Sequence, residues 1–194
     1  KLINNKEMIL HVYEAAKKSN TGEVFVATPD QKIIDLIKNS GGNAVATASN
    51  HQTGTDRIFE VFKNQLNSEP GIIINLQGDM PNIDAQSITN LVTYMKEDKC
   101  DIGTLASTFS TKLEFEDENN VKVATYEKLA ANNFVKATDF FRAPLETNKN
   151  LYHHIGIYAF TNKALVRYVS LKRSNLELKR KLEQLRALEN NMSI

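Results

Sequence analysis

The chain has 194 residues, enough to bury a sizeable core within one domain, and its 24 basic and 23 acidic side chains nearly cancel. Such a balance gives no strong field of one sign, which argues against nucleic acid or an anionic membrane as a partner. The apolar runs are far shorter than the ~20 residues that cross a bilayer, and the single cysteine, Cys100, excludes an internal disulfide framework. We therefore expect a soluble protein of the reducing cytoplasm.

Patterns of helix and strand alternate through the first half of the chain. The expected helices cover Lys6 to Ser19, the segment from the candidate N-cap Asp30 to Gly41-Gly42, a third helix bearing Ile58, Phe59, Val61, Phe62 and Leu66, and a fourth that Asp84 caps, bearing Ile88, Leu91, Val92 and Met95. The expected strands are Val24 to Thr28, Ala44 to Ala46, Ile72 to Leu76 and Ile102 to Thr108. Ile72 to Leu76 is apolar on both faces, which is typical of a parallel strand in a doubly wound α/β sheet.

In the second half of the chain, helices and strands no longer alternate. Three expected strands follow one another without crossover helices, and are therefore predicted to be antiparallel additions to the sheet: Val121 to Tyr126, Phe134 to Phe140 and Tyr152 to Phe160. Two helices then close the chain, Lys163 to Leu171 and Leu176 to Glu189, the second with Leu178, Leu182, Leu185 and Leu188 on one side and an intrahelical pair Glu177–Lys181. The polar stretches Glu114 to Asn120 and Glu146 to Asn150 are expected as loops. The whole pattern predicts an α/β fold with a mixed, mainly parallel central sheet.

The first candidate site is the loop Gln77 to Pro81, which follows the most buried strand. In an open α/β sheet, ligands bind outside the carboxyl ends of the strands. Gly78 permits close approach of the backbone to a ligand, and Asp79 offers the hard oxygen that Mg²⁺ prefers. The loop suits a metal–nucleotide complex, although a polar turn without any ligand is the alternative.

The second candidate is the segment Asn50 to Arg57, at another junction of strand and helix. Free backbone N–H groups and the helix dipole favour anions there, and Arg57 could add a charge. Equally, Thr55 or Asp56 could be ordinary helix caps, and Arg57 a solvated residue or an ion-pair partner.

The third candidate is the strand Tyr152 to Tyr158. Its alternation puts His154, Gly156 and Tyr158 on a polar face that could bind a polyhydroxy acid, and two isoleucines on the core face. Adjacent histidines on an extended strand cannot converge on one metal ion, so a zinc site is rejected. A satisfied, partly buried His154 is the alternative. Dehydrogenase, P-loop and hydrolase motifs are all missing from the sequence.

Four motifs in order resemble the 3-deoxy-manno-octulosonate cytidylyltransferases, or CMP-Kdo synthetases. They are Thr53-Gly54-Thr55-Asp56-Arg57, Asn75-Leu76-Gln77-Gly78-Asp79-Met80-Pro81, His153-His154-Ile155-Gly156-Ile157-Tyr158 and Leu182-Glu183-Gln184-Leu185-Arg186. The resemblance implies a three-layer, Rossmann-like fold of the nucleotide-diphospho-sugar-transferase kind and a homodimer. It also implies the reaction: the anomeric hydroxyl of Kdo attacks the α-phosphate of CTP, pyrophosphate leaves, and CMP-Kdo goes to lipopolysaccharide assembly.

By position, the resemblance also implies roles for individual residues. Asp79 matches the Mg²⁺ ligand and Gln77 the residue between nucleotide and sugar. The nucleotide-binding positions are Gly54, Thr55, Asp56, Arg57, Gln77 and Gly78. The sugar-binding positions are Gln77, Arg142, His154, Tyr158, Glu183 and Gln184, where an arginine suits the Kdo carboxylate.

The sequence departs from this family in three places. We expect residues 1–194 to form a single cytidylyltransferase domain that lacks the family's N-terminal triphosphate loop and its C-terminal segment with a second metal-binding aspartate. Met80 stands where many members carry an acidic residue. Two alternatives therefore stay open beside a Kdo enzyme: a CMP-sialic acid synthetase-like enzyme, and a catalytically inactive nucleotide-binding module.

Overall fold

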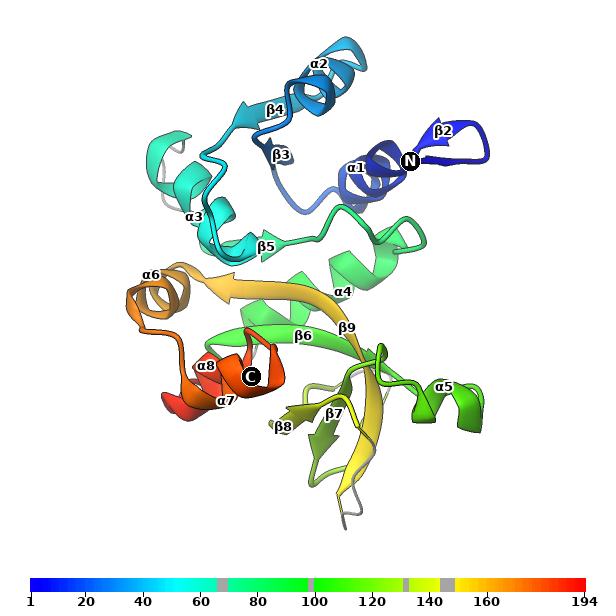
Figure 1. The fold of residues 1–194 in the computed structure, drawn as a ribbon, viewed down its shortest axis with the longest axis vertical. Helices are drawn as coiled ribbons and strands as arrows, with labels where there is room; N and C mark the ends of the chain where they lie inside the picture. Colours follow the sequence, from blue (N-terminus) through cyan, green and yellow to red (C-terminus); the bar gives the residue numbers. More distant parts are fainter. Residues whose placement is uncertain (66–69, 98–99, 131–132, 144–148) are drawn as a thin grey trace.

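Strands in three sheets carry the fold, and helices pack around them (Figure 1). The computed structural model describes residues 1–65, 70–97, 100–130, 133–143 and 149–194. Its helices are α1 (Met8–Ser19), α2 (Gln31–Asn39), α3 (Gly54–Gln65), α4 (Ala85–Glu97), α5 (Lys112–Glu116), α6 (Asn162–Ser170), α7 (Asn175–Arg180) and α8 (Leu185–Glu189). Its strands are β1 (Leu2–Ile3), β2 (Lys6–Glu7), β3 (Phe25–Thr28), β4 (Asn43–Ala46), β5 (Ile72–Asn75), β6 (Ile102–Ser107), β7 (Lys122–Thr125), β8 (Ala137–Phe141) and β9 (Asn150–Thr161).

The long strand β9 organises the largest sheet. It pairs antiparallel with β5, β6 and β7, and β8 extends the sheet beyond β7 (Figure 1). Because β9 lies between β5 and β6, these two strands run in the same direction but bond to β9 and not to each other. Within the described ranges only β3 and β4 form a parallel pair. The mixed α/β sheet is therefore confirmed, but the expected excess of parallel pairs, and the parallel pairing of the strand at residue 72, are not found.

Local signals in the first half predicted the elements well. The carboxylate of Asp30 accepts a hydrogen bond from the backbone N–H of Lys32 at 2.8 Å, and Asp84 accepts one from the N–H of Ser87 at 3.1 Å. Both aspartates thus satisfy N–H groups that the helix itself leaves unpaired, which confirms the expected starts of α2 and α4.

The expected helix from Leu176 to Glu189 is wrong, because the chain turns in its middle. Lys181 adopts a left-handed conformation, with φ of 55°, and ends α7 before α8 begins. The turn buries Leu182 within the core, whereas Leu178 stays 51% exposed. Glu177 is buried and pairs with two arginines, so the expected pair with Lys181 is wrong as well.

Two short elements were missed. The polar stretch from Glu114 contains the end of α5, and an Asn4-Asn5 turn with positive φ joins β1 to β2. The strand expected from Phe134 begins only at Ala137. Leu66 and residues 146–148 lie outside the described residues.

Two hydrophobic clusters lie on opposite faces of β9. Ile157 and Ala159 pack with α4 residues, whereas Tyr158 and Phe160 join a larger cluster with α6 and the α7–α8 segment. Both faces of the later part of this strand are therefore covered, and the side chains from Ile157 to Phe160 are buried in both directions. Among the described helices, none has the length and apolar content needed to cross a bilayer.

Candidate functional site

The end of β5 meets the start of α3. Asn75, the last residue of β5, is buried and lies opposite Tyr158 of β9. Its side-chain amide donates a hydrogen bond to the hydroxyl of Thr55 at 3.1 Å. Gly54 lies beside the same amide, since a Cβ at this glycine would be 3.7 Å from it. Strand, helix and β9 thus converge where open α/β sheets bind ligands.

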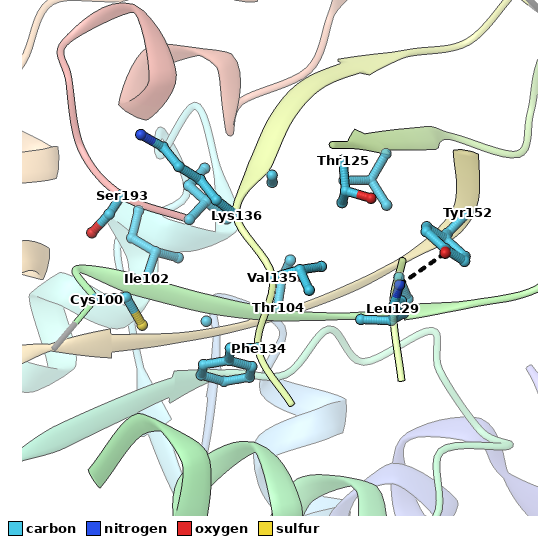
Figure 2. Close-up of a pocket in the computed structure, with 15 residues that line it drawn as sticks. Cys100, Ile102, Thr104, Thr125, Leu129, Phe134, Val135, Lys136, Tyr152 and Ser193 are labelled. Carbon is cyan, nitrogen blue, oxygen red and sulfur yellow. Dashed lines mark hydrogen bonds between the residues drawn. The ribbon is translucent and has the colours of Figure 1, made fainter. Parts of the chain in front are cut away.

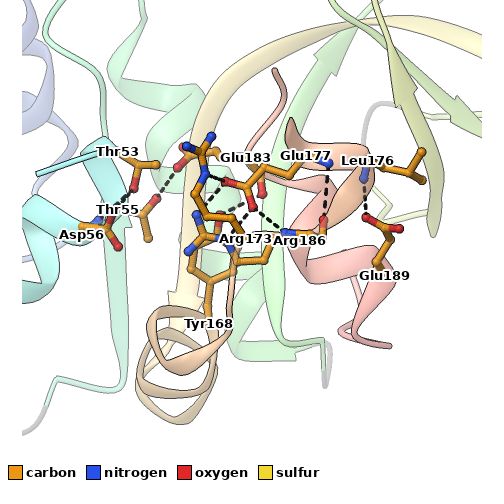
Figure 3. Close-up of polar contacts among 11 residues, drawn as sticks. Thr53, Thr55, Asp56, Tyr168, Arg173, Leu176, Glu177, Glu183, Arg186 and Glu189 are labelled. Atoms are coloured by element: carbon orange, nitrogen blue, oxygen red, sulfur yellow. Dashed lines mark hydrogen bonds and ion pairs between the residues drawn. The ribbon is translucent and has the colours of Figure 1, made fainter. Parts of the chain in front are cut away.

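A directed chain of hydrogen bonds continues from Thr55 to Glu183. Thr55 is buried, with only 1% of its surface exposed. Its hydroxyl donates a hydrogen bond to Oε2 of Glu183 at 3.2 Å (Figure 3). A hydroxyl has one hydrogen, so Thr55 accepts from Asn75 and gives its own proton to the carboxyl group. Glu183 must therefore present an acceptor oxygen toward α3.

Burial raises the pKa of the Glu183 carboxyl above its ordinary value. The hydrogen bond from Thr55 and the charge of Arg186 oppose this rise, whereas the Asp56 carboxylate adds to it. The group is therefore a weaker acid than an exposed glutamate, and suited to bonding with hydroxyl groups in either protonation state.

A buried ion pair supports the segment that carries Glu183. The guanidinium of Arg186 makes two hydrogen bonds to the Glu177 carboxylate, at 2.8 and 2.7 Å, and Arg173 adds a third at 2.8 Å (Figure 3). The Arg186 guanidinium also lies 4.7 Å from the ring centre of Tyr168, whose hydroxyl donates to the backbone carbonyl of Glu183 at 2.8 Å. Thr55 thus holds the side chain of Glu183, and Tyr168 holds its backbone.

Residues at and near the start of α3 form hydrogen bonds with the helix and with the loop before it. The Thr53 hydroxyl accepts from the N–H of Asp56 at 3.2 Å and lies 2.9 Å from its carboxylate. Thr53, and neither Thr55 nor Asp56, is thus the N-cap. Arg57 donates to the Thr47 hydroxyl at 2.6 Å and to the Ala48 carbonyl at 3.0 Å, and so fixes the loop between β4 and α3.

The loop after β5 is more open. Gln77 and Asp79 are exposed, and a Cβ at Gly156 would lie 3.6 Å from Nε2 of Gln77, which places Gln77 beside the glycine of β9. In the part of the chain that the structure describes, no group of three or more His, Cys, Asp or Glu residues could hold a metal ion. The single carboxylate of Asp79 fits Mg²⁺ in the way that this ion commonly binds, with substrate phosphates and water completing the ligands.

His154 and Tyr158 share one face of β9 with Gly156, as the alternation predicted, but this face is not an open polar wall. Both side chains are buried, with ring centres 5.6 Å apart. Burial lowers the pKa of His154 to about 3 and raises the pKa of Tyr158, so both are neutral at pH 7. The Thr104 hydroxyl donates to the carbonyl of Ile157 at 2.6 Å, so Nε2 of His154, 3.0 Å away, must donate to Thr104. Nδ1 of His154 is then an acceptor.

A hollow of about 320 Å³ lies between β6, β7 and residues 134–137 (Figure 2). Its walls are mostly apolar, and the hydroxyl of Tyr152 accepts from the Leu129 N–H at 2.9 Å at one side. Of the residues that the sequence singled out as candidate sites, only Tyr152, at the start of the third candidate strand, lines it.

Comparison with known proteins places the chain in a family. The cytidylyltransferase family model matches residues 1–194. The 3-deoxy-manno-octulosonate cytidylyltransferase of Thermodesulfovibrio yellowstonii is 40% identical over 99% of this chain and 80% of its own length, and that of Bartonella quintana is 41% identical over 99% and 79%. The chain belongs to the 3-deoxy-manno-octulosonate cytidylyltransferase family. A solved structure of CMP:2-keto-3-deoxy-manno-octonic acid synthetase complexed with CTP matches 100% of this chain and 79% of that one, with 33% identity and a TM-score of 0.86.

The expected Rossmann-like α/β fold of this family is confirmed by that likeness. Of the site residues predicted from the sequence, the structure brings together Gly54, Thr55, Gln77, Tyr158 and Glu183. Gln184, the residue after Glu183, is buried and is the N-cap of α8.

Arg142 does not join this group. Its guanidinium donates to the backbone carbonyls of Glu118 and Asn119, at 3.3 and 3.4 Å, near α5. Its sugar-binding role stays a prediction, as do the individual roles of the other site residues.

Sequence reasoning missed Asn75, Thr104 and Tyr168 as parts of the site. For Asn75 a signal existed, because an amide that ends a run of three isoleucines must find a buried partner. Thr104 and Tyr168 gave none, since each forms its site contact with a residue distant in the sequence.

Proposed function

We propose that this chain joins CTP to Kdo, giving CMP-Kdo for lipopolysaccharide assembly and releasing pyrophosphate. The observation that carries this proposal is the likeness, over 100% of this chain and 79% of the other, to the synthetase structure complexed with CTP. In the reaction the anomeric oxygen of Kdo forms a bond to the α-phosphorus as the bond to the pyrophosphate oxygen breaks, and the hydroxyl proton is lost to solvent or a nearby base.

The proposed sugar pocket uses the neutral, buried groups around Glu183. Nδ1 of His154 can accept from a sugar hydroxyl, the Glu183 carboxyl can bond to another, and Gln77 lies beside Gly156, from where it can reach the sugar. Arg142 is proposed to bind the Kdo carboxylate, since a guanidinium matches that group in charge and shape. Tyr158 and Gln184 complete the proposed pocket.

The proposed nucleotide site combines the start of α3 with the loop after β5. Its residues are Gly54, Thr55, Asp56, Arg57, Gln77 and Gly78. Since Thr55 and Arg57 are engaged inside the protein, we propose that they shape this site and that the exposed loop meets the phosphates. Mg²⁺ held by Asp79 would neutralise charge on the phosphate oxygens when bound.

We also propose a cytoplasmic homodimer that takes small-molecule substrates and neither nucleic acid nor membrane as a partner. A lone cysteine suits a reducing compartment, and a near-zero net charge gives no attraction to polyanions.

Pyrophosphate release by the full-length protein with CTP, Mg²⁺ and Kdo tests the reaction. We expect release that depends on Kdo and falls at least ~100-fold in Asp79→Ala, because the charge on the transferred phosphate is no longer neutralised. Asp35→Ala, which removes an exposed carboxylate on α2, is the matched control and should keep full activity. Pyrophosphate release with a sialic acid in place of Kdo would show that the sugar substrate is a sialic acid. No release with either sugar acid would favour an inactive nucleotide-binding module.

A further inference from the structure

Lys122, the first residue of β7, is completely buried, with 0% of its surface exposed. Lysine is almost never fully buried without partners. Here its ammonium donates to three backbone carbonyls, those of Asp117 at 2.7 Å, Asn120 at 2.9 Å and Arg142 at 2.8 Å. An ammonium has three donors, so all are used inside the protein and none is left for a substrate.

The carbonyls of the two residues between Asp117 and Asn120 bind a second cationic side chain. Glu118 and Asn119 accept from Nη1 of Arg142. Four consecutive carbonyls, of residues 117–120, thus accept hydrogen bonds from only two side chains, Lys122 and Arg142. We call residues 117–120 the carbonyl turn.

Other contacts shape the carbonyl turn from within. The carboxylate of Asp117 accepts from the N–H of Asn119 at 2.8 Å, and the Asn120 amide donates to the carbonyl of Glu114 at 2.9 Å. The Lys122 ammonium lies 5.7 Å from the ring centre of Phe115 at the end of α5. Burial lowers the pKa of Lys122, while the Asp117 and Glu118 carboxylates oppose that shift.

The position of Lys122 in the sheet links the turn to the proposed sugar pocket. Lys122 lies opposite Phe141 on β8 and opposite His153 on β9. One residue earlier, the carbonyl of Val121 accepts from the N–H of His154 at 2.9 Å. The strand that carries Lys122 therefore lies between β8, which Arg142 directly follows, and His154 on β9.

We propose that Lys122 is a positioning residue for Arg142: it fixes the carbonyl turn that holds the Arg142 guanidinium, and it holds the Arg142 backbone directly. In this role Lys122 sets the direction from which Arg142 meets the carboxylate of the sugar acid. The inference rests on the proposed function, in which Arg142 binds that carboxylate.

The test compares Lys122→Met with wild type in the pyrophosphate assay on the full-length protein. Methionine keeps most of the volume but donates nothing, so we expect the KM for Kdo to rise on the order of tenfold, while kcat and the KM for CTP change less than about threefold. Lys163→Met, at an exposed lysine of α6, is the control and should change neither KM. Equal rises in both KM values, or a fall in kcat alone, would overturn the inference.

A double-mutant cycle with Arg142→Met separates positioning from a general loss of structure. If Lys122 acts through Arg142, the double variant has the same KM for Kdo as Arg142→Met alone. Independent, multiplied effects would contradict the proposal.

Should Lys122→Met fail to fold, Asn120→Ala tests the same idea from the other side of the carbonyl turn, because it removes only the bond to Glu114. We expect a rise of about threefold in the KM for Kdo alone. An unchanged KM for Kdo would then overturn the inference. Wild-type protein without Kdo-dependent release would instead refute the proposed function itself.

Discussion

The hydroxyl of Thr55 donates a hydrogen bond to Oε2 of Glu183 at 3.2 Å, although 128 positions separate the two residues (Figure 3). This bond joins the start of α3 to the segment between α7 and α8, and Asn75 extends it to the end of β5. Three elements that meet at the proposed site are thus connected through one hydroxyl group. Its removal should affect both folding and sugar binding.

Thr55→Val tests this connection. Valine has nearly the same shape but leaves the Asn75 amide and the Glu183 oxygen without their buried partner, so we expect the free energy of unfolding to fall by about 1–3 kcal/mol. The KM for Kdo should rise as Glu183 loses its fixed orientation. Urea unfolding and steady-state kinetics measure the two effects.

Thr93→Val is the matched control, since this threonine is exposed on α4 and bonds only to its own helix. Equal unfolding midpoints and an equal KM for Kdo in wild type and Thr55→Val would show that the hydroxyl has no such role.

The ion pair between Glu177 and Arg186 predicts a loss of stability in acid. Burial alone would raise the pKa of Glu177, but hydrogen bonds from Arg186 and Arg173 and the charge of Arg186 bring it below the ordinary value. A carboxyl with a lowered pKa stabilises the fold above its unfolded pKa, about 4.3, and this stabilisation is lost as the pH falls through the folded pKa. Wild type should therefore lose stability below about pH 4.

Substitutions at the same pair separate charge from packing. Glu177→Gln leaves the Arg186 charge buried without its carboxylate and should cost about 3–5 kcal/mol, whereas Glu177→Leu with Arg186→Met should cost less, because no unpaired charge remains. Urea unfolding at pH 7 and pH 4 measures the stability of wild type and of these variants. Between pH 7 and pH 4, the double variant should lose less stability than wild type. A steeper acid loss in the double variant than in wild type would refute this account.

His154 should stay neutral throughout the physiological range. Its folded pKa of about 3 lies below the ordinary histidine value, so the unfolded chain binds a proton that the folded protein does not. Stability from this group is complete above about pH 6.5 and decreases as the pH falls toward 3, by up to about 1.4 kcal/mol for each pH unit. Nitrogen NMR of the imidazole should show a proton on Nε2 alone at pH 5.5.

His154→Gln is the control for this pH dependence of stability. The amide of the glutamine side chain can still donate to Thr104, but it does not titrate. Its unfolding free energy should depend less on pH between 6.5 and 4.5 than that of wild type. An imidazole protonated on both nitrogens at pH 5.5 would contradict the prediction.

Local patterns predicted the parts of the fold that depend on near neighbours. The caps at Asp30 and Asp84 were found because an N-cap bonds within three residues. The end of α7 at Lys181 was missed, since the leucine spacing also fits one continuous helix and only tertiary burial of Leu182 favours the turn.

The candidate site shows the same limit. Alternation placed His154 and Tyr158 correctly on one face of β9, but it cannot show that both faces of that strand are covered. Likewise, the motif containing Thr55 indicated the correct place, while its bond to Glu183 depends on how distant elements pack. The family resemblance supplied the grouping that periodicity could not.

Gly156 offers a last test, because we expect the lack of a side chain there to matter for the proposed site and not for the fold. A Cβ there would lie 3.6 Å from the Gln77 amide, an ordinary contact, so Gly156→Ala should keep the unfolding free energy within about 0.5 kcal/mol and yet raise the KM for Kdo by narrowing the space beside Gln77. Gly103→Ala gives the opposite result, since its Cβ would lie 2.7 Å from Sδ of Met95 in the core and should cost about 1–3 kcal/mol. If Gly156→Ala instead destabilised the fold as much as Gly103→Ala and left the KM unchanged, the space at Gly156 would serve packing and the sugar pocket would have to lie elsewhere.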